Sequence, residues 1–369
     1  MSTKVGILGV GGMYGYHRNG FRRAGAEIVA VADIDEPKAR RTAEEDGIPN
    51  HYTSLAAMLE GSGKNLDAVS VILPNSLHAP MAIEALQAGK HVYVEKPAAL
   101  NAVEARLMQD AATEANRILM CAMNNRARPD FCDLMERYGR GFLGKANSAQ
   151  VYWRRPHGIP GFGGWFTTKA PADRKPAAGG GPGIDLLHML DLALTVMGYP
   201  KPLYVLAGTF NTFMDDPSFK GPWGIPDVAN GTIDVESSMH AMVTFEGGRV
   251  LHTIMSWAEM IEREIVSLAV QCTNGGARME RLFGVDGLDD TATDTYQVFA
   301  HDLGKHVVVT PVVTPDPTMG RVAAAANFIK AIEGAEQPLT PFVQSVRLMS
   351  IITAMYNSAA MGAPVSLVA

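Results

Sequence analysis

Glu95 and Lys96, followed by Pro97, form a pair of charged side chains that could take part in a reaction. They come directly after residues 91–94, a short β-branched and aromatic run that is typical of a buried strand. In an open parallel α/β sheet, ligands bind outside the carboxyl ends of the strands. Pro97 fixes its own φ and disfavours a helical conformation at Lys96, so the lysine should be held on a stiff, extended turn. The alternative is an ordinary strand end with a solvated charged pair.

A second candidate pair, Asp185 and His188, follows three consecutive glycines and Pro182. Glycine allows close approach to another backbone and proline suits a first helical turn, so residues 184–197 are predicted to form a helix. Residues three apart on a helix share one face. A histidine on an apolar helix is usually part of the core, but the glycines before it and the aspartate beside it favour a role in a site. Histidine titrates near neutrality and can therefore accept a proton.

A glycine-rich turn, GVGGMYG at residues 9–15, follows a predicted apolar strand at residues 4–8. It nearly matches the dinucleotide fingerprint GxGxxG. Gly9 would permit the tight turn, and Gly11 would let the backbone approach a pyrophosphate at the N-terminus of the following helix. Tyr14 stands at the third glycine position, with a glycine one residue later, so the helix should begin slightly differently from the usual motif.

The second predicted strand, residues 27–32, ends at Asp33, at about the distance from the glycine turn where an acidic residue holds the ribose hydroxyls. Asp33 and Asp35 would repel a 2′-phosphate, which favours NAD over NADP as the cofactor. The strand at residues 67–73 and the turn at residues 74–78 should contribute to the same edge of the sheet. The cofactor-binding residues predicted from these turns are Gly9, Gly11, Gly12, Met13, Tyr14, Asp33, Ile34, Leu73, Pro74, Asn75, His78, Glu95 and Lys96.

Strands and helices alternate up to about residue 125, which predicts a Rossmann-type, doubly wound parallel sheet for residues 1–125. In this arrangement His78 lies near the start of a helix, so the alternative to cofactor binding is a helix N-terminal residue without a ligand.

The remaining residues, 126–369, should form an α+β domain with a large, mostly antiparallel open sheet. Its expected strands are residues 148–153, 203–207, 238–245, 250–257, 265–271 and 307–313.

The segment between residues 154 and 175 is long and rich in glycine, proline and aromatic residues. Within a compact domain, such a segment is more often a functional loop than a linker. Arg154 and Trp165 are therefore candidate substrate-binding residues, the arginine through hydroxyl groups and Trp165 with Phe166 as a wall for a sugar face. The alternatives are a solvated arginine and aromatic packing within the loop. The other substrate-binding candidates are Lys96, Asp185 and His188.

Composition and charge restrict the class of protein. The chain has 369 residues, of which 47% are hydrophobic and 19% charged, as expected for a compact protein of two or three domains. A formal net charge of −6 argues against nucleic acid or an anionic membrane as a partner. The spacings of cysteine, histidine and acidic residues suggest neither a disulfide framework nor a metal site. Without a signal peptide or a run of about 18 apolar residues, we expect a cytoplasmic protein that does not enter a membrane.

Together these motifs resemble the Gfo/Idh/MocA oxidoreductases, the family of glucose–fructose oxidoreductase and inositol dehydrogenase. In the first part of the chain, the resemblance rests on the glycine turn with His17 after it, PNSLH at residues 74–78, AGKH at residues 88–91 and Glu95-Lys96-Pro97. In the second part, it rests on GGGP at residues 179–182, on Asp185, His188 and Asp191, on residues 328–332 and on the last helix. The resemblance spans nearly the whole chain.

The resemblance implies that Lys96 contacts both the substrate and the nicotinamide ribose, and that the Lys96–Pro97 bond can be cis. It also implies that an aspartate and a histidine of the second domain meet the reacting hydroxyl, here Asp185 and His188, and that the protein is a homo-oligomer, a dimer or tetramer. One feature departs from the family. The usual DxGxH spacing has three intervening residues, whereas Asp185 and His188 have two, so the angle between the side chains should differ.

The predicted function is therefore that of an NAD-dependent oxidoreductase, which transfers a hydride from a secondary hydroxyl of a sugar, glycoside or cyclitol. His188 is the predicted proton acceptor, Lys96 would polarise the same oxygen, and Asp185 would orient the substrate or His188. The family uses either residue as base, so the choice between His188 and Lys96 stays open. Two other functions also stay open: a glycoside-cleaving enzyme that uses NAD transiently, through oxidation and elimination, and a non-catalytic dinucleotide-binding sensor.

Overall fold

The computed structural model describes residues 2–170, 176–282 and 293–368. The chain divides into two compact units. Unit 1 contains Met1–Arg128 and Asp316–Met349, and unit 2 contains Pro129–Pro315 and Ser350–Ala369. The first boundary lies close to the predicted limit at residue 125. The return of the chain to unit 1 differs from the prediction, which placed all of residues 126–369 in the second domain.

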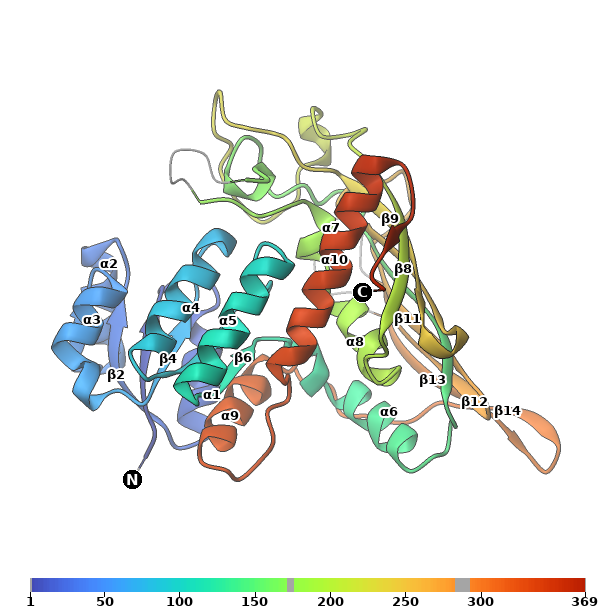
Figure 1. The fold of residues 1–369 in the computed structure, drawn as a ribbon, viewed down its shortest axis with the longest axis horizontal. Coiled ribbons are helices and arrows are strands. Elements are labelled where there is room, and N and C mark those ends of the chain that lie inside the picture. The colour runs from blue at the N-terminus through green and yellow to red at the C-terminus, as the bar shows by residue number, and fades with distance from the viewer. Residues whose placement is uncertain (1, 171–175, 283–292, 369) are drawn as a thin grey trace. The chain divides into compact units, whose positions relative to one another are not determined.

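Unit 1 is built on a six-stranded parallel sheet in the order β3-β2-β1-β4-β5-β6 (Figure 1). Its strands are β1 (Lys4–Leu8), β2 (Glu27–Ala32), β3 (Asn50–Tyr52), β4 (Ala68–Val71), β5 (His91–Val94) and β6 (Leu119–Cys121). The order confirms the predicted doubly wound sheet. It reverses between β1 and β4, and folds of this kind bind their ligands at such a reversal.

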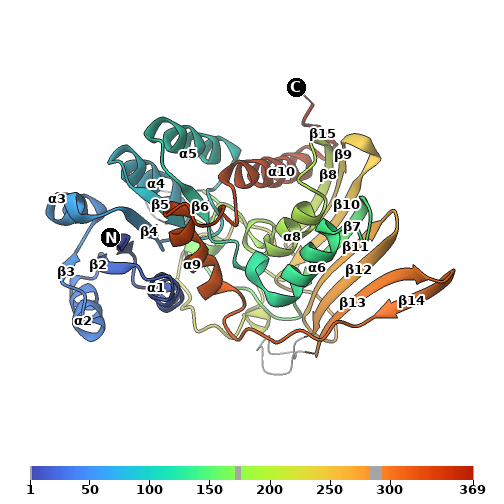
Figure 2. The same ribbon diagram turned by 90° about the horizontal axis from the view of Figure 1, so that it is seen from below.

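Helices cover both faces of this sheet (Figure 2). They are α1 (Tyr14–Arg23), α2 (Glu36–Asp46), α3 (Leu55–Ser62), α4 (His78–Gln87), α5 (Ala102–Ala115) and α9 (Arg321–Ile332). Local signals set several of their ends. The side chain of Asn101 accepts hydrogen bonds from the N–H groups of Val103 and Glu104 at the start of α5, and Gly47 ends α2 with a φ of 65°.

Helix α9 joins unit 1 because it packs on α1. A Cβ at Gly20 of α1 would lie 2.4 Å from the Cβ of Ala325, so a glycine is needed for this approach. Phe328 of α9 stacks on Tyr93 of β5 with ring centroids 5.2 Å apart, and Phe21 belongs to the same buried cluster. These aromatic contacts explain why the segment containing α9 belongs to unit 1. Because the segment lies far along the chain from α1 and β5, no local sequence pattern shows this contact.

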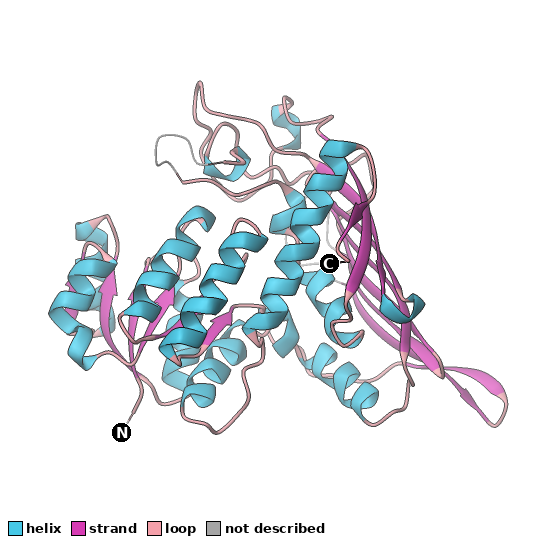
Figure 3. Ribbon diagram, in the orientation of Figure 1, coloured by secondary structure: helices cyan, strands magenta, loops and turns pink. Residues whose placement is uncertain are grey.

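Unit 2 is built on a nine-stranded sheet in the order β14-β13-β12-β11-β7-β10-β9-β8-β15 (Figure 3). Its strands are β7 (Ala146–Arg154), β8 (Pro202–Phe210), β9 (Ser238–Phe245), β10 (Val250–Ser256), β11 (Ile265–Cys272), β12 (Gly275–Leu282), β13 (Thr293–Asp302), β14 (Lys305–Val309) and β15 (Val365–Ser366). Neighbouring strands are antiparallel except for β7 and β10, which are parallel. The predicted large, mostly antiparallel sheet is therefore confirmed.

Three of these strands, β12, β13 and β15, were not predicted. The sequence of β12, GGARMERL, begins with two glycines and includes three charged residues, a composition that disfavours strands. It forms a strand because β11 and β13 pair with it on both sides. Strand β14 is also shorter than the predicted run at residues 307–313.

The helices of unit 2 are α6 (Pro129–Gly139), α7 (Pro182–Asp185) and α8 (His188–Val196), and the chain passes from unit 1 to unit 2 within α10 (Phe342–Met361). The prediction of one continuous helix over residues 184–197 is wrong. The backbone leaves the helical conformation at Leu186, where ψ is 26°, so Asp185 and His188 belong to different helices. Helices α6 and α8 lie on one face of the sheet (Figure 2).

Candidate active site residues in the two units

The glycine turn joins β1 to α1. Gly9 has a φ of 95°, and a Cβ at this position would lie 1.9 Å from the carbonyl oxygen of Ile72, so only glycine fits. A Cβ at Gly11 or Gly12 would meet nothing within 4 Å. Helix α1 follows, and its N-cap, Met13, makes no side-chain capping bond. A glycine-rich loop, ahead of a helix N-terminus without a side-chain cap, fits a dinucleotide pyrophosphate.

Asp33 follows β2 and turns its carboxylate toward the glycine turn. Its Oδ2 accepts a hydrogen bond from the N–H of Val10 at 3.0 Å, and its Oδ1 accepts one from the N–H of Asp35 at 3.1 Å. The Nζ of Lys38 lies 3.5 Å from Oδ2, and Ile34 is 94% exposed beside it. A carboxylate fixed next to the glycine turn is suitably placed for the ribose hydroxyls of a dinucleotide.

Two residues predicted to bind the cofactor turn their side chains into the protein. The hydroxyl of Tyr14 donates a hydrogen bond to Asp46, and burial together with this carboxylate raises the pKa of Tyr14. His78 has no exposed surface, and its Nδ1 and Nε2 lie 2.7 and 2.8 Å from the carbonyl oxygens of Pro97 and Leu73. The ring of His78 is therefore engaged within unit 1, and its contact with the cofactor stays a prediction. Because its side chain is bonded to Asp46, Tyr14 can take part in the glycine turn only through its backbone.

The turn after β5, residues 95–97, is called the Lys96 turn below. Its Lys96–Pro97 peptide bond is cis. Oε1 of Glu95 lies 2.7 Å from Nε2 of His17, and Oε2 accepts a hydrogen bond from the N–H of Lys96 at 3.0 Å. Burial alone would raise the pKa of Glu95, but the hydrogen bond from His17 and the charge of Lys96 outweigh it and lower this pKa. Glu95 therefore faces inward and supports the turn, while Lys96 is half-buried.

Ser70 was not identified from the sequence, although its Oγ lies 2.8 Å from Nδ1 of His17. The only signal for it was a polar residue within an otherwise apolar strand. A serine, a histidine and a glutamate in one hydrogen-bonded chain have the composition of a hydrolase triad. Ser70 lies within β4 and has no exposed surface, so it cannot act as a nucleophile. The chain from Ser70 through His17 to Glu95 is therefore a support for the Lys96 turn.

In unit 2, Asp185 ends α7 and His188 begins α8. Oδ2 of Asp185 accepts a hydrogen bond from the indole N–H of Trp257 at 3.0 Å, and Trp257 has no exposed surface. His188 is 7% exposed, and its ring centroid lies 6.1 Å from that of Trp153, with the ring planes 36° apart. The break between the helices, rather than a shared helical face, sets the direction of the two side chains. Neither tryptophan was identified from the sequence.

A buried carboxylate lies beneath the triple glycine. Glu236 accepts hydrogen bonds from the N–H groups of Gly181 and Gly183, both at 3.1 Å, and from the hydroxyl of Tyr356 at 2.7 Å. Burial raises the pKa of Glu236, although these three donors oppose the change. A Cβ at Gly181 would lie 2.2 Å from the carbonyl oxygen of Glu236, which explains the glycine at this position.

The two loop candidates make contacts within unit 2. Nε and Nη2 of Arg154 lie 2.7 and 2.6 Å from Oε2 of Glu259, so this arginine forms an ion pair instead of being simply solvated. The ring of Trp165 stacks on that of Phe166, with centroids 3.7 Å apart and planes at 30°. The stacked pair fits both interpretations of the loop, a wall for a sugar face and internal packing.

Comparison with known proteins identifies the family. A family model described as the oxidoreductase family with an NAD-binding Rossmann fold matches residues 3–123, and a Gfo/Idh/MocA C-terminal domain matches residues 132–278. A D-glucoside 3-dehydrogenase from Escherichia coli (strain K12) is 30% identical over 344 residues, which cover 92% of this chain and 90% of that protein. The chain belongs to the Gfo/Idh/MocA oxidoreductase family.

A further relative and a solved structure also align over nearly the whole chain. A D-xylose 1-dehydrogenase (NADP(+)) from Haloferax volcanii is 29% identical over 347 residues, which cover 92% of both chains. The structure of levoglucosan dehydrogenase in complex with NADH has a TM-score of 0.80 at 21% identity, covers 100% of this chain and 99% of its own, and shows a shared fold. Family membership makes a nicotinamide dinucleotide the cofactor of unit 1, and the glycine turn and Asp33 fit this group.

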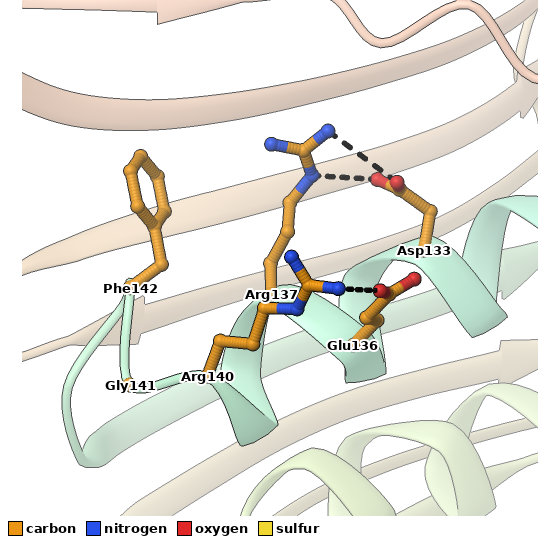
Figure 4. Close-up of a pocket in the computed structure, with 6 residues that line it drawn as sticks. All are labelled: Asp133, Glu136, Arg137, Arg140, Gly141 and Phe142. Atoms are coloured by element: carbon orange, nitrogen blue, oxygen red, sulfur yellow. Dashed lines mark hydrogen bonds and ion pairs between the residues drawn. The ribbon is translucent and has the colours of Figure 1, made fainter.

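A pocket of about 380 Å³ at the end of α6 contains none of the predicted Gfo/Idh/MocA site residues. The residues that line it are Asp133, Glu136, Arg137, Arg140, Gly141 and Phe142 (Figure 4). Arg137 pairs with Asp133 and Arg140 pairs with Glu136, so both arginines are neutralised by their own helix.

Among the described residues, no three or more His, Cys, Asp and Glu side chains form a group that could hold a metal ion. No helix in that part of the chain is long and apolar enough to cross a membrane.

Proposed function

We propose that the protein is an NAD-dependent dehydrogenase that oxidises a secondary hydroxyl of a sugar, glycoside or cyclitol. The proposal is carried by the groups along one edge of the unit 1 sheet. The glycine turn follows β1, Asp33 follows β2 and Lys96 follows β5, all at carboxyl ends of parallel strands. A dinucleotide at the β1–β4 reversal and an amine at the same edge suit a redox reaction. The name of the Escherichia coli relative, a D-glucoside 3-dehydrogenase, supports testing glucosides first.

In this proposal each unit contributes to the reaction. The glycine turn and Asp33 would hold the nicotinamide dinucleotide, which would supply the hydride acceptor for the carbon that carries the hydroxyl. His188 removes the hydroxyl proton, a role that suits an imidazole near neutral pH, and its ring lies beside that of Trp153. Lys96 polarises the hydroxyl through its ammonium group, and Asp185, held by Trp257, orients the substrate or His188. Arg154 and Trp165 complete the proposed substrate contacts.

Asp33 supports NAD as the cofactor rather than NADP. Its carboxylate, fixed by the N–H of Val10, would repel a 2′-phosphate. Lys38 offers a single positive charge, and its Nζ already lies 3.5 Å from that carboxylate. The xylose dehydrogenase relative is named for NADP(+), whereas the levoglucosan dehydrogenase structure contains NADH. The cofactor preference of this protein is therefore part of the test below.

The test is an assay of reduced-nicotinamide absorbance with NAD or NADP and a panel of methyl glucosides, monosaccharides and inositols. We expect the absorbance to grow with NAD and at least one sugar, glycoside or inositol, and more slowly with NADP. Release of the aglycone without net reduction of NAD would replace the proposal by transient oxidation and elimination. Binding of NADH without turnover of any panel member would replace it by a sensor function.

The outer face of the unit 2 sheet supports a homo-oligomer. On the face opposite α8, Tyr204 and Leu206 of β8 and Met242 of β9 have exposed fractions of 50%, 45% and 37%, and Leu206 pairs directly with Met242. An apolar strip of this kind is typical of an interface. We propose that a second copy covers it in a dimer or tetramer in the cytoplasm. A monomer mass by light scattering at micromolar concentration would contradict the oligomer.

A further inference from the structure

Two buried histidines hold the Lys96 turn, and neither belongs to the groups proposed to react. His17 on α1 is 2% exposed, and its Nε2 lies 2.7 Å from Oε1 of Glu95. His78, the first residue of α4, is 0% exposed, and its Nδ1 lies 2.7 Å from the carbonyl oxygen of Pro97. The residues on either side of Lys96 in the chain are therefore each hydrogen-bonded to a different histidine.

The same two histidines also bind the neighbouring strand, β4. Nδ1 of His17 lies 2.8 Å from Oγ of Ser70 within β4, and Nε2 of His78 lies 2.8 Å from the carbonyl oxygen of Leu73, just after β4 ends. Strand β4 also adjoins β1, which carries the glycine turn. The position of the Lys96 turn is therefore set by α1, α4 and β4 as well as by its own backbone.

The chemistry of the partners gives these contacts a direction. The ionised carboxylate of Glu95 only accepts hydrogen bonds, so Nε2–H of His17 donates to it. Both ring nitrogens of His78 face carbonyl oxygens, and because burial lowers the pKa of His78 and favours a neutral ring with one N–H, the ring donates to either Pro97 or Leu73. With Nε2 of His17 donating to Glu95, its Nδ1 can accept the hydroxyl hydrogen of Ser70. Removing either ring would leave a buried acceptor without a donor, and the turn would have to move to find one.

We propose that His17 and His78 are positioning residues that hold the ammonium group of Lys96 at one place on the sheet edge. The kinetic part of this inference rests on the proposed function, and the structural part does not. A reacting group misplaced by about 1 Å can lower a rate by about 10²-fold. Loss of either histidine should therefore lower kcat more than it changes the KM for NAD.

The test compares His17→Ala and His78→Ala with His91→Ala as a matched control. His91 lies at the opposite end of β5, where its Nδ1 accepts the N–H of Ile118 at 2.9 Å, so its loss weakens the same strand without touching the turn. Hydrogen exchange of a peptide covering residues 95–100, measured by mass spectrometry, should become several-fold faster in the two test variants and stay unchanged in the control. In the test variants, kcat should fall about tenfold or more, with the KM for NAD within about twofold.

Two milder variants keep the test decisive if an alanine variant does not fold. His17→Gln retains an N–H donor for Glu95, and Ser70→Ala removes only the second contact of His17, so both should keep most of the exchange protection and most of kcat. Unchanged exchange in His17→Ala and His78→Ala, or an equal loss of kcat in His91→Ala, would overturn the inference. If the wild-type protein turned over no sugar, the proposed function would fail, while the exchange measurement would still decide whether the histidines hold the turn.

Discussion

A buried glutamate supports the Lys96 turn in unit 1 and another supports the segment before Asp185 in unit 2, and these two glutamates differ in their electrostatics. Glu95 in unit 1 is 8% exposed, is hydrogen-bonded to His17 and lies next to Lys96; these partners outweigh burial and lower its pKa. Glu236 in unit 2 is 7% exposed and accepts hydrogen bonds from the Tyr356 hydroxyl and two backbone N–H groups; burial raises its pKa.

The comparison shows that the number of hydrogen bonds does not decide the ionisation of a buried carboxylate. Glu236 has more donors than Glu95, yet its pKa is the raised one. Nearby positive charge stabilises a carboxylate directly, whereas neutral donors only replace part of the lost water. The carboxylate of Glu95 in the Lys96 turn is therefore stabilised by the hydrogen bond from His17 together with nearby positive charge. The segment before Asp185 is held by close packing, since a Cβ at Gly180 would lie 2.1 Å from the hydroxyl oxygen of Tyr356.

The prediction with the largest expected effect tests whether unit 1 and unit 2 each contribute a reacting group. We expect Lys96→Ala and His188→Ala each to lower kcat by about 10²-fold or more, the usual scale for groups that move or stabilise a proton. Lys64→Ala in unit 1 and His306→Ala in unit 2 replace exposed residues and should keep wild-type turnover in the same assay. Near-normal turnover in both test variants would contradict the proposed roles, and a loss in only one would show that a single unit supplies the reacting group.

A prediction of intermediate size tests whether close packing of the glycines against Glu236 stabilises unit 2. A Cβ at Gly181 would lie 2.2 Å from the carbonyl oxygen of Glu236, so Gly181→Ala must displace backbone, and we expect the free energy of unfolding to fall by about 1–3 kcal/mol. Gly208→Ala in β8 is the control, because its Cβ would meet nothing within 4 Å. Urea unfolding measures both variants. Equal stability would show that close packing does not hold this segment.

The prediction with the smallest expected effect tests the opposite pKa shifts of Glu95 and Glu236. Because the pKa of Glu95 lies below its ordinary 4.5, its ionised form stabilises the fold above that pH, and the contribution is lost as the pH falls through the lowered pKa. Because the pKa of Glu236 is raised above 4.5, its charge destabilises the fold at higher pH, and stability is regained as the pH falls through the raised pKa.

Substitution by glutamine should expose this difference. Glu95→Gln should be most destabilising near neutral pH and less so below about pH 4, whereas Glu236→Gln should be more destabilising near pH 5 than near pH 7. The two variants should therefore show opposite pH trends in their loss of stability. Unfolding free energies at these pH values provide the measurement, and the same pH trend in both variants would refute the electrostatic contrast.

The features predicted correctly from the sequence depend on local conformation. Gly9 needs a positive φ at the end of β1, and that requirement is visible in the glycine motif itself. Asp33 and Lys96 each follow a short apolar run, so their places at strand ends could be predicted. The features missed depend on partners far along the chain. Strand β12 exists because β11 and β13 pair with it, and the break at Leu186 interrupts a run that is helical by pattern alone.

By itself, the sequence determined the doubly wound sheet, the glycine turn and the family motifs, because strand alternation and turn chemistry act between near neighbours. Only the tertiary structure decided which candidate side chains are buried in hydrogen-bonded networks. His78 is wholly buried against Pro97 and Leu73, Glu95 is turned toward His17, and Ser70 joins the same network. The reason is physical: a buried polar group must find its partner wherever the fold brings one, and that partner can lie anywhere along the chain.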